Sequence, residues 1–324
     1  MASPSLLSQP GLDAELIGAP ETPLQQALAY FRRDRLAVAG FYVLVVLVVL
    51  AVVGKVLTEW WVLLDPKTIR LADKLKAPLA PAGPGLSADP FGVYWFGTDE
   101  LGRSVFARML QGSSVSLSIG LVAVSISVSI GIVLGGIAGY YGNRKLGPIS
   151  IDTLIMRFTD VAMCFPSFFL ILTVVALLPP GIFKVMIVIG ATSWMGTARF
   201  VRAEFLTLRE LDFVLAAKAL GLPEWRIIFR HMLPNAMAPV FVSSSIDVAT
   251  AILTESALSF LGFGVQPPHA TWGNVLADGR SYIFDAPWLF VIPGAAILIV
   301  VLAFNLVGEG LREAFSPRLR KRRG

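Results

Sequence analysis

The segment LDFVLAAKALGLPEWRIIFRHMLPNAMAP, residues 211–239, separates two long apolar runs and carries the signals of two short helices. Glycine commonly follows the C-terminus of a helix in a left-handed conformation, so Gly221 is predicted to end the first helix. Pro223 fits the first turn of a second helix, where the N–H that proline lacks is not needed. Pro234 is then expected to stop or kink this second helix. We therefore predict a helical hairpin between two membrane spans.

The predicted hairpin combines a bare helix face with positive charge. The bare face consists of Ala216, Ala217, Ala219 and Gly221. The second helix adds the basic side chains Arg226, Arg230 and His231. Because small side chains let another surface approach the backbone closely, we interpret the hairpin as a docking element for a partner.

The composition defines the class of protein. Apolar residues make up 55% of the chain and charged residues only 15%, whereas soluble domains carry about 25% charged residues. The mean hydropathy is +0.72, and the apolar residues form long uninterrupted runs. We therefore predict an all-α polytopic membrane protein. The net charge of +5 does not indicate nucleic-acid binding, because the basic residues flank the apolar runs and fill the tail, as the positive-inside rule describes.

Six transmembrane helices are predicted, each long enough to cross a hydrocarbon layer of ~30 Å. They lie near residues 36–56, 113–140, 155–178, 183–200, 236–261 and 286–307. The fourth has the weakest pattern, since Lys184 and Arg199 bracket a short run, but it is needed to place the hairpin in the cytoplasm. Arginines before the first span place the N-terminus there too. No signal-peptide pattern precedes that span, so we expect an uncleaved insertion signal.

These spans divide the chain into five parts, with both termini in the cytoplasm. Residues 1–35 form a cytoplasmic segment with an amphipathic helix, residues 36–56 the first span, and residues 57–112 an external loop. Residues 113–310 form the transmembrane core, with the hairpin at residues 203–235, and residues 311–324 form a basic cytoplasmic tail.

The end of the external loop predicts a further helix. Thr98 or Asp99 could cap it, and Leu101, Val105 and Met109 recur at every fourth position. An amphipathic helix is therefore expected at the outer membrane surface. In the second span, a stripe of small residues follows the same spacing, at Gly131, Gly135 and Gly139. Such a stripe lets helices touch closely, either within the chain or between two subunits.

The hairpin resembles the EAA loop of ATP-binding-cassette (ABC) importer permeases, in which EAA is followed by glycine and then by I-x-L-P. The matching residues are Ala216, Ala217, Gly221, Leu233 and Pro234. The chain departs from the pattern at Leu215, which replaces the glutamate, and at His231, which replaces the isoleucine.

Three further stretches resemble the branch of this family that includes the dipeptide, oligopeptide and nickel systems. They are FGTDELGRSVFARMLQGSSVSLSIG (residues 96–120), LTESALSFLGFGVQPPHATWG (residues 253–273) and GLREAFSPRLR (residues 310–320). Taken together, the matches cover most of the chain. The chain is most similar to the "C" permease subunit of a peptide importer.

The resemblance implies a type I ABC importer permease in the inner membrane of a prokaryote. It also implies a homologous second permease, one or two cytosolic P-loop ATPases and an external substrate-binding protein. ATP and Mg would bind the ATPases, so no cofactor is expected on this chain. The residues implied to couple to the ATPase are Ala216, Ala217, Lys218, Gly221, Leu222, Arg226 and Arg230. The two arginines would bind acidic ATPase residues or, alternatively, lipid phosphates.

Three acidic residues fall within predicted spans, where charge is costly and usually faces protein or water. They are Asp160, Asp247 and Glu255, and we take them as candidates for the translocation path. Asp247 and Glu255 are separated by roughly two helical turns, which predicts a shared face. An acidic lining would suit the amino terminus of a peptide or a metal cation. The alternatives are an interhelical hydrogen bond or, for Asp160, a position at a helix end.

Several kinds of chemistry have no pattern in the sequence. There is no G-x-x-x-x-G-K-[ST] loop for ATP, no metal-ligand spacing around His231 or His269, and no nucleophile–base arrangement. We therefore predict a non-catalytic permease subunit that transports di- or oligopeptides with energy from partner ATPases. A nickel or other small-solute permease of the same branch is the nearest alternative. A stand-alone secondary transporter would predict internal repeats, and a membrane scaffold would not need the acids.

Overall fold

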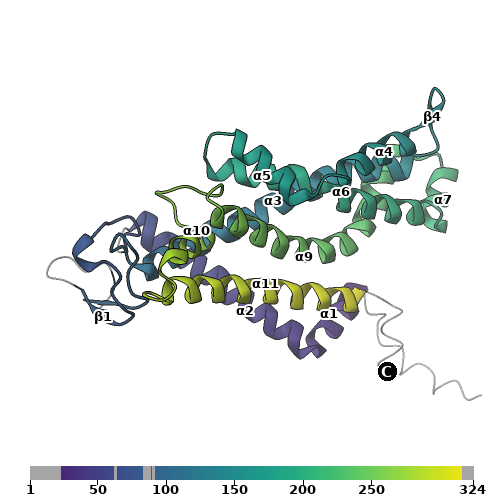
Figure 1. Ribbon diagram of the computed structural model, residues 1–324. Coiled ribbons are helices and arrows are strands. Elements are labelled where there is room, and N and C mark those ends of the chain that lie inside the picture. Colours follow the sequence, from purple (N-terminus) through teal and green to yellow (C-terminus); the bar gives the residue numbers. More distant parts are fainter. Residues whose placement is uncertain (1–22, 62–63, 83–88, 90–91, 316–324) are drawn as a thin grey trace, which may run out of the picture.

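The computed structural model describes residues 23–61, 64–82, 89 and 92–315 (Figure 1). The helices are α1 (Pro23–Arg33), α2 (Arg35–Lys55), α3 (Val105–Tyr141), α4 (Ile151–Met163), α5 (Ser167–Leu177), α6 (Ile182–Arg209), α7 (Asp212–Ala219), α8 (Glu224–Arg226), α9 (Leu233–Phe260), α10 (Trp272–Gly279) and α11 (Trp288–Phe315). Antiparallel pairs join β1 (Ala80–Pro81) to β2 (Val93–Tyr94) and β3 (Lys145–Leu146) to β4 (Ile149–Ser150). The predicted helical membrane class is confirmed. Residues 1–22 and 316–324, with much of the predicted N-terminal segment and basic tail, lie outside the described residues.

Within the described residues, four helices are long and apolar enough to cross a membrane. They are Arg35–Trp60, in which a π-helical turn extends α2, Val105–Tyr141, Glu224–Phe260 and Trp288–Phe315. Helices α4 and α5 meet the same criterion only as a pair, with a bend of 80° between them. Helix α6 has 28 residues but is not apolar enough to be counted with these spans.

The third predicted span is wrong as a single helix, because it breaks between α4 and α5. Helix α4 ends at Met163, and Pro166 precedes the first residue of α5. Proline removes a backbone donor and disfavours the helical conformation of the residue before it. The 80° bend is therefore the direct consequence of Pro166 within an otherwise apolar run.

The predicted surface helix before the second span is also wrong, because both belong to the single helix α3. Its N-cap is Ser104, whose hydroxyl accepts a hydrogen bond from the Ala107 backbone, and Val105 and Met109 are buried. Further along α3, the small-residue stripe packs within the chain against α6. A Cβ added at Gly135 would lie 2.4 Å from the Ala198 carbonyl oxygen. A Cβ added at Gly131 would lie 2.6 Å from the Thr197 side chain, and one added at Gly139 would lie 2.5 Å from that of Phe205.

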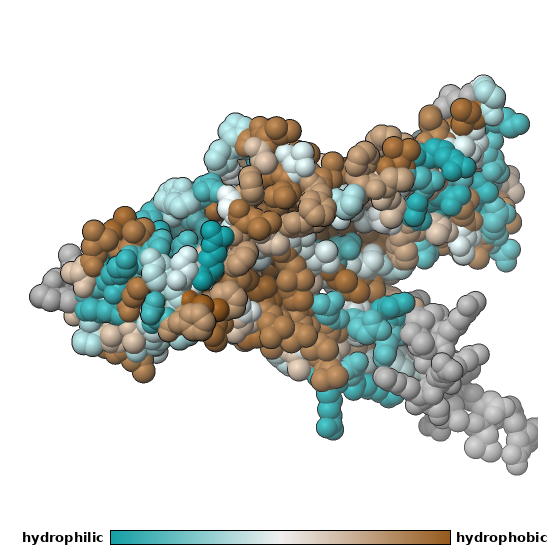
Figure 2. Space-filling view, viewed as in Figure 1, coloured by the Kyte–Doolittle hydropathy of each residue, from teal (hydrophilic) through white to brown (hydrophobic). Residues whose placement is uncertain are grey.

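Figure 1 shows two arms that are joined at one end of the molecule. One arm holds α3 to α9 and the other holds α1, α2 and α11, and they separate toward the end where α7 lies. At the joined end lies a region that we call the external domain, after its predicted position, and define as the described residues 64–104 with α10. Figure 2 shows hydrophobic residues over the middle of the molecule and hydrophilic residues around the α7 end, as expected for a protein that crosses a membrane.

Candidate coupling hairpin and translocation path

The hairpin is organised by the turn after α7. Gly221 has φ of +70°, a left-handed conformation that favours glycine. Its N–H bonds the Lys218 carbonyl, and the N–H of Leu222 bonds the Ala217 carbonyl at 3.2 Å. These two bonds form a Schellman motif, which satisfies the free carbonyls at the end of a helix. The predicted end of the first helix is therefore confirmed.

The second half of the hairpin differs from the sequence prediction. Pro223 has extended ψ and lies at the N-cap of α8 rather than within its first turn. Helix α8 continues through a π-helical turn, Ile227–Met232, directly into α9. The N–H of Leu233 bonds the Ile228 carbonyl five residues back. Pro234, which has no N–H, therefore lies in the first turn of α9, and the helix passes through it without stopping.

The small-residue face is only partly available to a partner. Ala216, Lys218 and Gly221 are exposed, and a Cβ at Gly221 would meet no atom within 4 Å. Ala217, in contrast, is only 3% exposed and packs in a cluster with Phe205 and Val214. Its small side chain lets α7 lie against the rest of the hairpin, so Ala217 is not part of a free docking face.

Large apolar side chains on the hairpin were missed from the sequence. Leu220 is 82% exposed, Trp225 60% and Phe229 64%. They surround the Gly-Leu-Pro turn, where a solvent-exposed loop would ordinarily carry polar residues. Large apolar residues beside a turn were therefore the feature of the sequence that could have identified this surface. Exposed apolar groups gathered on a projecting element mark an interaction surface.

The charged residues near the hairpin fall into two groups. Arg144, beside β3, forms an ion pair with Glu224 of the hairpin, and its guanidinium lies 4.7 Å from the centre of the Tyr141 ring. Arg226 lies over the Trp225 ring at 5.3 Å. Among the described residues, neither Arg226 nor Arg230 has an acidic partner within 4 Å. These two exposed cations therefore remain available to anionic groups of a partner or of lipid.

The three acidic candidates for the path lie in different surroundings. Asp160 of α4 is half-exposed and forms ion pairs with Arg199 of α6 and, at 3.8 Å, with Arg157. It therefore links two helices. Glu255 is fully buried, and its Oε1 accepts a 2.7 Å hydrogen bond from the Ser259 hydroxyl.

Glu255 lies where α3, α9 and α10 meet. The hydroxyl groups of Ser116 and Thr271 lie near its carboxyl group, although its Oε2 has no hydrogen-bond partner among the described residues. Ser116 in turn accepts a 3.2 Å hydrogen bond from the backbone N–H of Trp272. These contacts hold α10 onto the spans, so the environment of Glu255 is that of a structural anchor.

Asp247 instead faces a small cavity between α3, α6 and α9. The cavity does not include Glu255, so the structure separates the surroundings of the two acids that were expected to share a face. Asp247 belongs to a polar stripe on α9 with Ser243, Thr250 and Thr254. The spacing of these positions repeats at three and four residues, as one helix face requires. The stripe is readable in the sequence SSSIDVATAILTES, but a search for charged residues alone does not find it.

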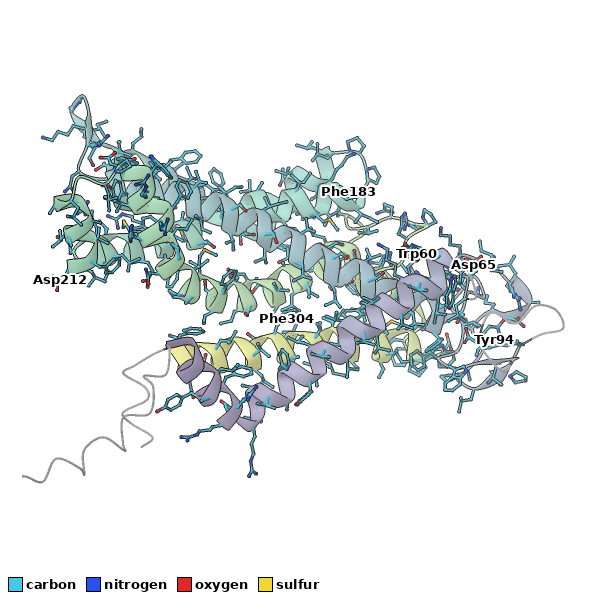
Figure 3. All side chains as sticks on the ribbon, turned by 180° about the vertical axis from the view of Figure 1, so that it is seen from behind. Trp60, Asp65, Tyr94, Phe183, Asp212 and Phe304 are labelled. Atoms are coloured by element: carbon cyan, nitrogen blue, oxygen red, sulfur yellow. The ribbon has the colours of Figure 1, made fainter. Side chains whose placement is uncertain are left out.

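The described residues contain no group of three or more His, Cys, Asp or Glu side chains that could hold a metal ion. Figure 3 shows Asp212 of the hairpin at one end of the molecule and Asp65 and Tyr94 of the external domain at the other. Helix α9, which carries the polar stripe, runs between these two ends. The arrangement is that of a membrane-spanning unit with a projecting hairpin at one end, the external domain at the other and a polar face on α9 between them.

These features define a multi-span transport permease, and comparison with known proteins gives its family. The chain belongs to the family described as binding-protein-dependent transport system inner membrane component, whose model matches residues 131–321. Residues 22–78 match the N-terminal TM domain of oligopeptide transport permease C. The resemblance drawn from the hairpin and the three flanking motifs is therefore confirmed, and the protein is a multi-pass component of the inner membrane.

Individual relatives agree with this family. The chain is 37% identical to the dipeptide transport system permease protein DppC of Alkalihalophilus pseudofirmus, over 92% of this chain and 91% of that protein. It is 35% identical to the oligopeptide transport system permease protein OppC of Bacillus subtilis, over 95% and 94% of the two chains. A solved inward-facing structure of the MetNI methionine ABC transporter is a more distant match, with a TM-score of 0.48 and 15% identity over 65% of this chain and 97% of that chain.

Proposed function

We propose that this chain is one of two permease subunits of an ATP-driven importer of di- or oligopeptides. The observation that supports this proposal most strongly is the projecting hairpin together with similarity, over more than 90% of the chain, to permease proteins named for dipeptide and oligopeptide transport. The partners are a homologous permease, one or two cytosolic P-loop ATPases and an external binding protein. ATP and Mg²⁺ bind to the ATPases, and this chain forms half of the translocation path.

The proposed topology has six crossings, with α6 as the fourth. Helix α6 packs along α3, and its charges at Arg199 and Arg202 are paired with Asp160 and Asp152 of α4. Pairing within the protein makes charged residues tolerable inside a membrane. In Figure 1, α1 and the end of α11 lie toward the hairpin end, which supports cytoplasmic placement of both termini.

The proposed mechanism begins at the hairpin. Its exposed apolar side chains Leu220, Trp225 and Phe229 enter a groove of the ATPase, and Arg226 and Arg230 bind acidic residues at its rim. Because α8 continues without a break into α9, movement of the docked hairpin is transmitted to α9. The polar stripe of α9, with Asp247 at its centre, then becomes accessible alternately from the two sides.

The experiment that tests this function is purification of the chain from its native membrane in mild detergent, followed by mass spectrometry and reconstitution. We expect a second permease and P-loop ATPases to co-purify, and proteoliposomes with the binding protein to accumulate a labelled dipeptide only when ATP is present. Uptake of nickel but not peptide by the same vesicles would overturn the substrate class. A chain that purifies alone and transports without ATP would overturn the importer itself.

A further inference from the structure

The cavity at Asp247 has an unusual balance of hydrogen-bonding groups. It encloses about 60 Å³ between three spans and opens beside Thr250, which is exposed. Its polar lining consists of Ser127, Ser193, Asp247, Thr250 and Thr254. The remaining lining is apolar. The cavity therefore receives polar groups from all three spans, with its only charged side chain and two of its four hydroxyl groups on α9.

Three of the four hydroxyl groups around the cavity already donate their hydrogens within their own helices. Ser193 donates to the Ile189 carbonyl at 2.7 Å, Thr250 to the Ile246 carbonyl at 3.2 Å and Thr254 to the Thr250 carbonyl at 2.8 Å. A hydroxyl has one hydrogen and two lone pairs. These three oxygens can therefore only accept further hydrogen bonds from whatever enters the cavity.

The carboxylate of Asp247 adds acceptors and a negative charge to the same space. Among the described residues, no cation or hydrogen-bond donor is paired with it. The other two candidate acids differ, since Asp160 has arginine partners and Glu255 accepts a hydrogen bond from the Ser259 hydroxyl. An ionised carboxylate away from water is unfavourable without a compensating donor or positive charge. The cavity therefore lacks the cation that would balance it.

We infer that this cavity binds a primary ammonium group, the positively charged head of the transported molecule. The inference rests on the proposed function and specifies how one end of the substrate is held on this chain. An ammonium group offers three donors and one positive charge, which matches a carboxylate and several acceptor-only hydroxyls. One water molecule needs about 10–15 Å³ of such cavity volume, so the cavity has room for a small head group while the rest of the molecule lies outside it.

Chemical protection of a cysteine placed in the cavity tests the inference on the intact importer. The native Cys164 is exposed and is first replaced by serine. Ser127, which is buried at the α3 side of the cavity, is then replaced by cysteine in the assembled complex in membranes. Its rate of reaction with a small methanethiosulfonate reagent is measured with and without Ala-Ala, N-acetyl-Ala-Ala or NaCl. Uptake of peptide with ATP is measured on the same vesicles.

We expect Ala-Ala to slow the reaction and N-acetyl-Ala-Ala, which has no ammonium group, to leave it unchanged. Asp247→Asn should raise the half-protecting concentration of Ala-Ala at least about tenfold, the effect of one hydrogen bond to a charged group. Asp247→Glu, which keeps the charge, should retain most of the protection. Labelling of the Ser127→Cys thiol without ligand reports that the cavity is intact in each variant.

Three results would overturn the inference. Equal protection by the two peptides would show that the ammonium group is not recognised, and protection by NaCl alone would assign the cavity to an inorganic cation. A cysteine that never reacts would show that the cavity is closed to the aqueous path. If the vesicles still take up peptide with ATP in any of these cases, the proposed function stands, whereas absence of uptake contradicts the function itself.

Discussion

The two ends of the molecule place their ion pairs differently. In the external domain the central ion pairs point inward. Asp99 is fully buried and accepts hydrogen bonds from Arg103 at 2.6 Å and Arg108 at 2.7 Å. At the hairpin the ion pair of Arg144 with Glu224 lies at the surface, and large apolar side chains point outward. The central ion pairs of the external domain are thus shielded from solvent, whereas the charged groups of the hairpin are accessible.

The interior of the external domain confirms this contrast. The hydroxyl of Tyr94 donates to Asp73 at 2.7 Å, and Tyr94 is fully buried. Burial, and then the hydrogen bond to Asp73, raise the pKa of Tyr94. Arg108 also bonds Asp278 of α10 at 2.8 Å. Buried polar contacts therefore hold the loop together and join it to the start of α3 and to α10.

The largest expected effect is the loss of Asp99. Replacing it by alanine leaves Arg103 and Arg108 without their central partner, and breaking a buried ion pair costs about 3–5 kcal/mol. Thermal unfolding of the purified importer in detergent should show this loss. The matched control is Asp278→Ala, whose carboxylate is 29% exposed and should cost less. Equal losses for both variants would contradict the idea that burial makes this end rigid.

At the other end, Gly221→Val should abolish coupling with a much smaller loss of stability. Valine has open space at this position but disfavours φ of +70°, at a cost of about 1–2 kcal/mol. We expect loss of ATP-dependent uptake while the variant still assembles in the membrane. Gly221→Asn should restore part of the activity, because asparagine tolerates the left-handed conformation. Normal uptake by Gly221→Val would remove Gly221 from the coupling element.

A smaller effect is expected for Leu220→Ser. Leu220 is 82% exposed, so its loss should leave the thermal stability of the chain unchanged. Affinity for the ATPase should fall by about tenfold, as for a moderate interface residue, when measured by titration of ATPase into permease proteoliposomes. The control is Leu71→Ser in the external domain, a residue with 68% exposure and no expected effect on ATPase binding. Equal binding by both variants would contradict the docking role of the hairpin.

Much of the fold was readable in the sequence because its causes are local. Long apolar runs predicted the spans that correspond to α2, α9 and α11. Gly221 predicted the end of α7 because glycine readily adopts the left-handed conformation that ends a helix. The break between α4 and α5 depends on Pro166, which lies inside a run that hydropathy predicts as one continuous span. Proline inside a helical pattern can bend or end it, and hydropathy alone does not distinguish the two outcomes.

The remaining errors have a tertiary cause. Ala217 was assigned to the docking face because it is small, but its direction depends on how α7 packs against Phe205 and Ile227. Glu255 and Asp247 were grouped because both are acids within one span. Their difference depends on α10, whose Thr271 reaches Glu255, and on α6, which closes the cavity at Asp247. No pattern within α9 contains these neighbours.

The smallest expected effect concerns Asp89, and it tests whether the interior of the external domain responds to pH. Burial raises the pKa of Asp89 above its ordinary value of 3.8, against the opposing hydrogen bonds from Ser104 and Trp95. The folded protein therefore binds this proton more tightly than the unfolded chain does. Stability from this group rises as pH falls through the raised pKa and levels off below 3.8.

Asp89→Asn removes that proton-binding step. The wild-type importer should therefore gain stability relative to this variant as the pH is lowered from 7 to 4. Thermal unfolding of both proteins in detergent measures this. Asp65, which is partly exposed in the same domain and bonds Thr68 at 2.7 Å, provides the control as Asp65→Asn. A shift in the opposite direction for Asp89→Asn would mean that its hydrogen bonds outweigh its burial. The interior of the external domain would then favour the ionised carboxylate of Asp89. The difference between this end and the hairpin would in that case depend only on the buried ion pairs of Asp99.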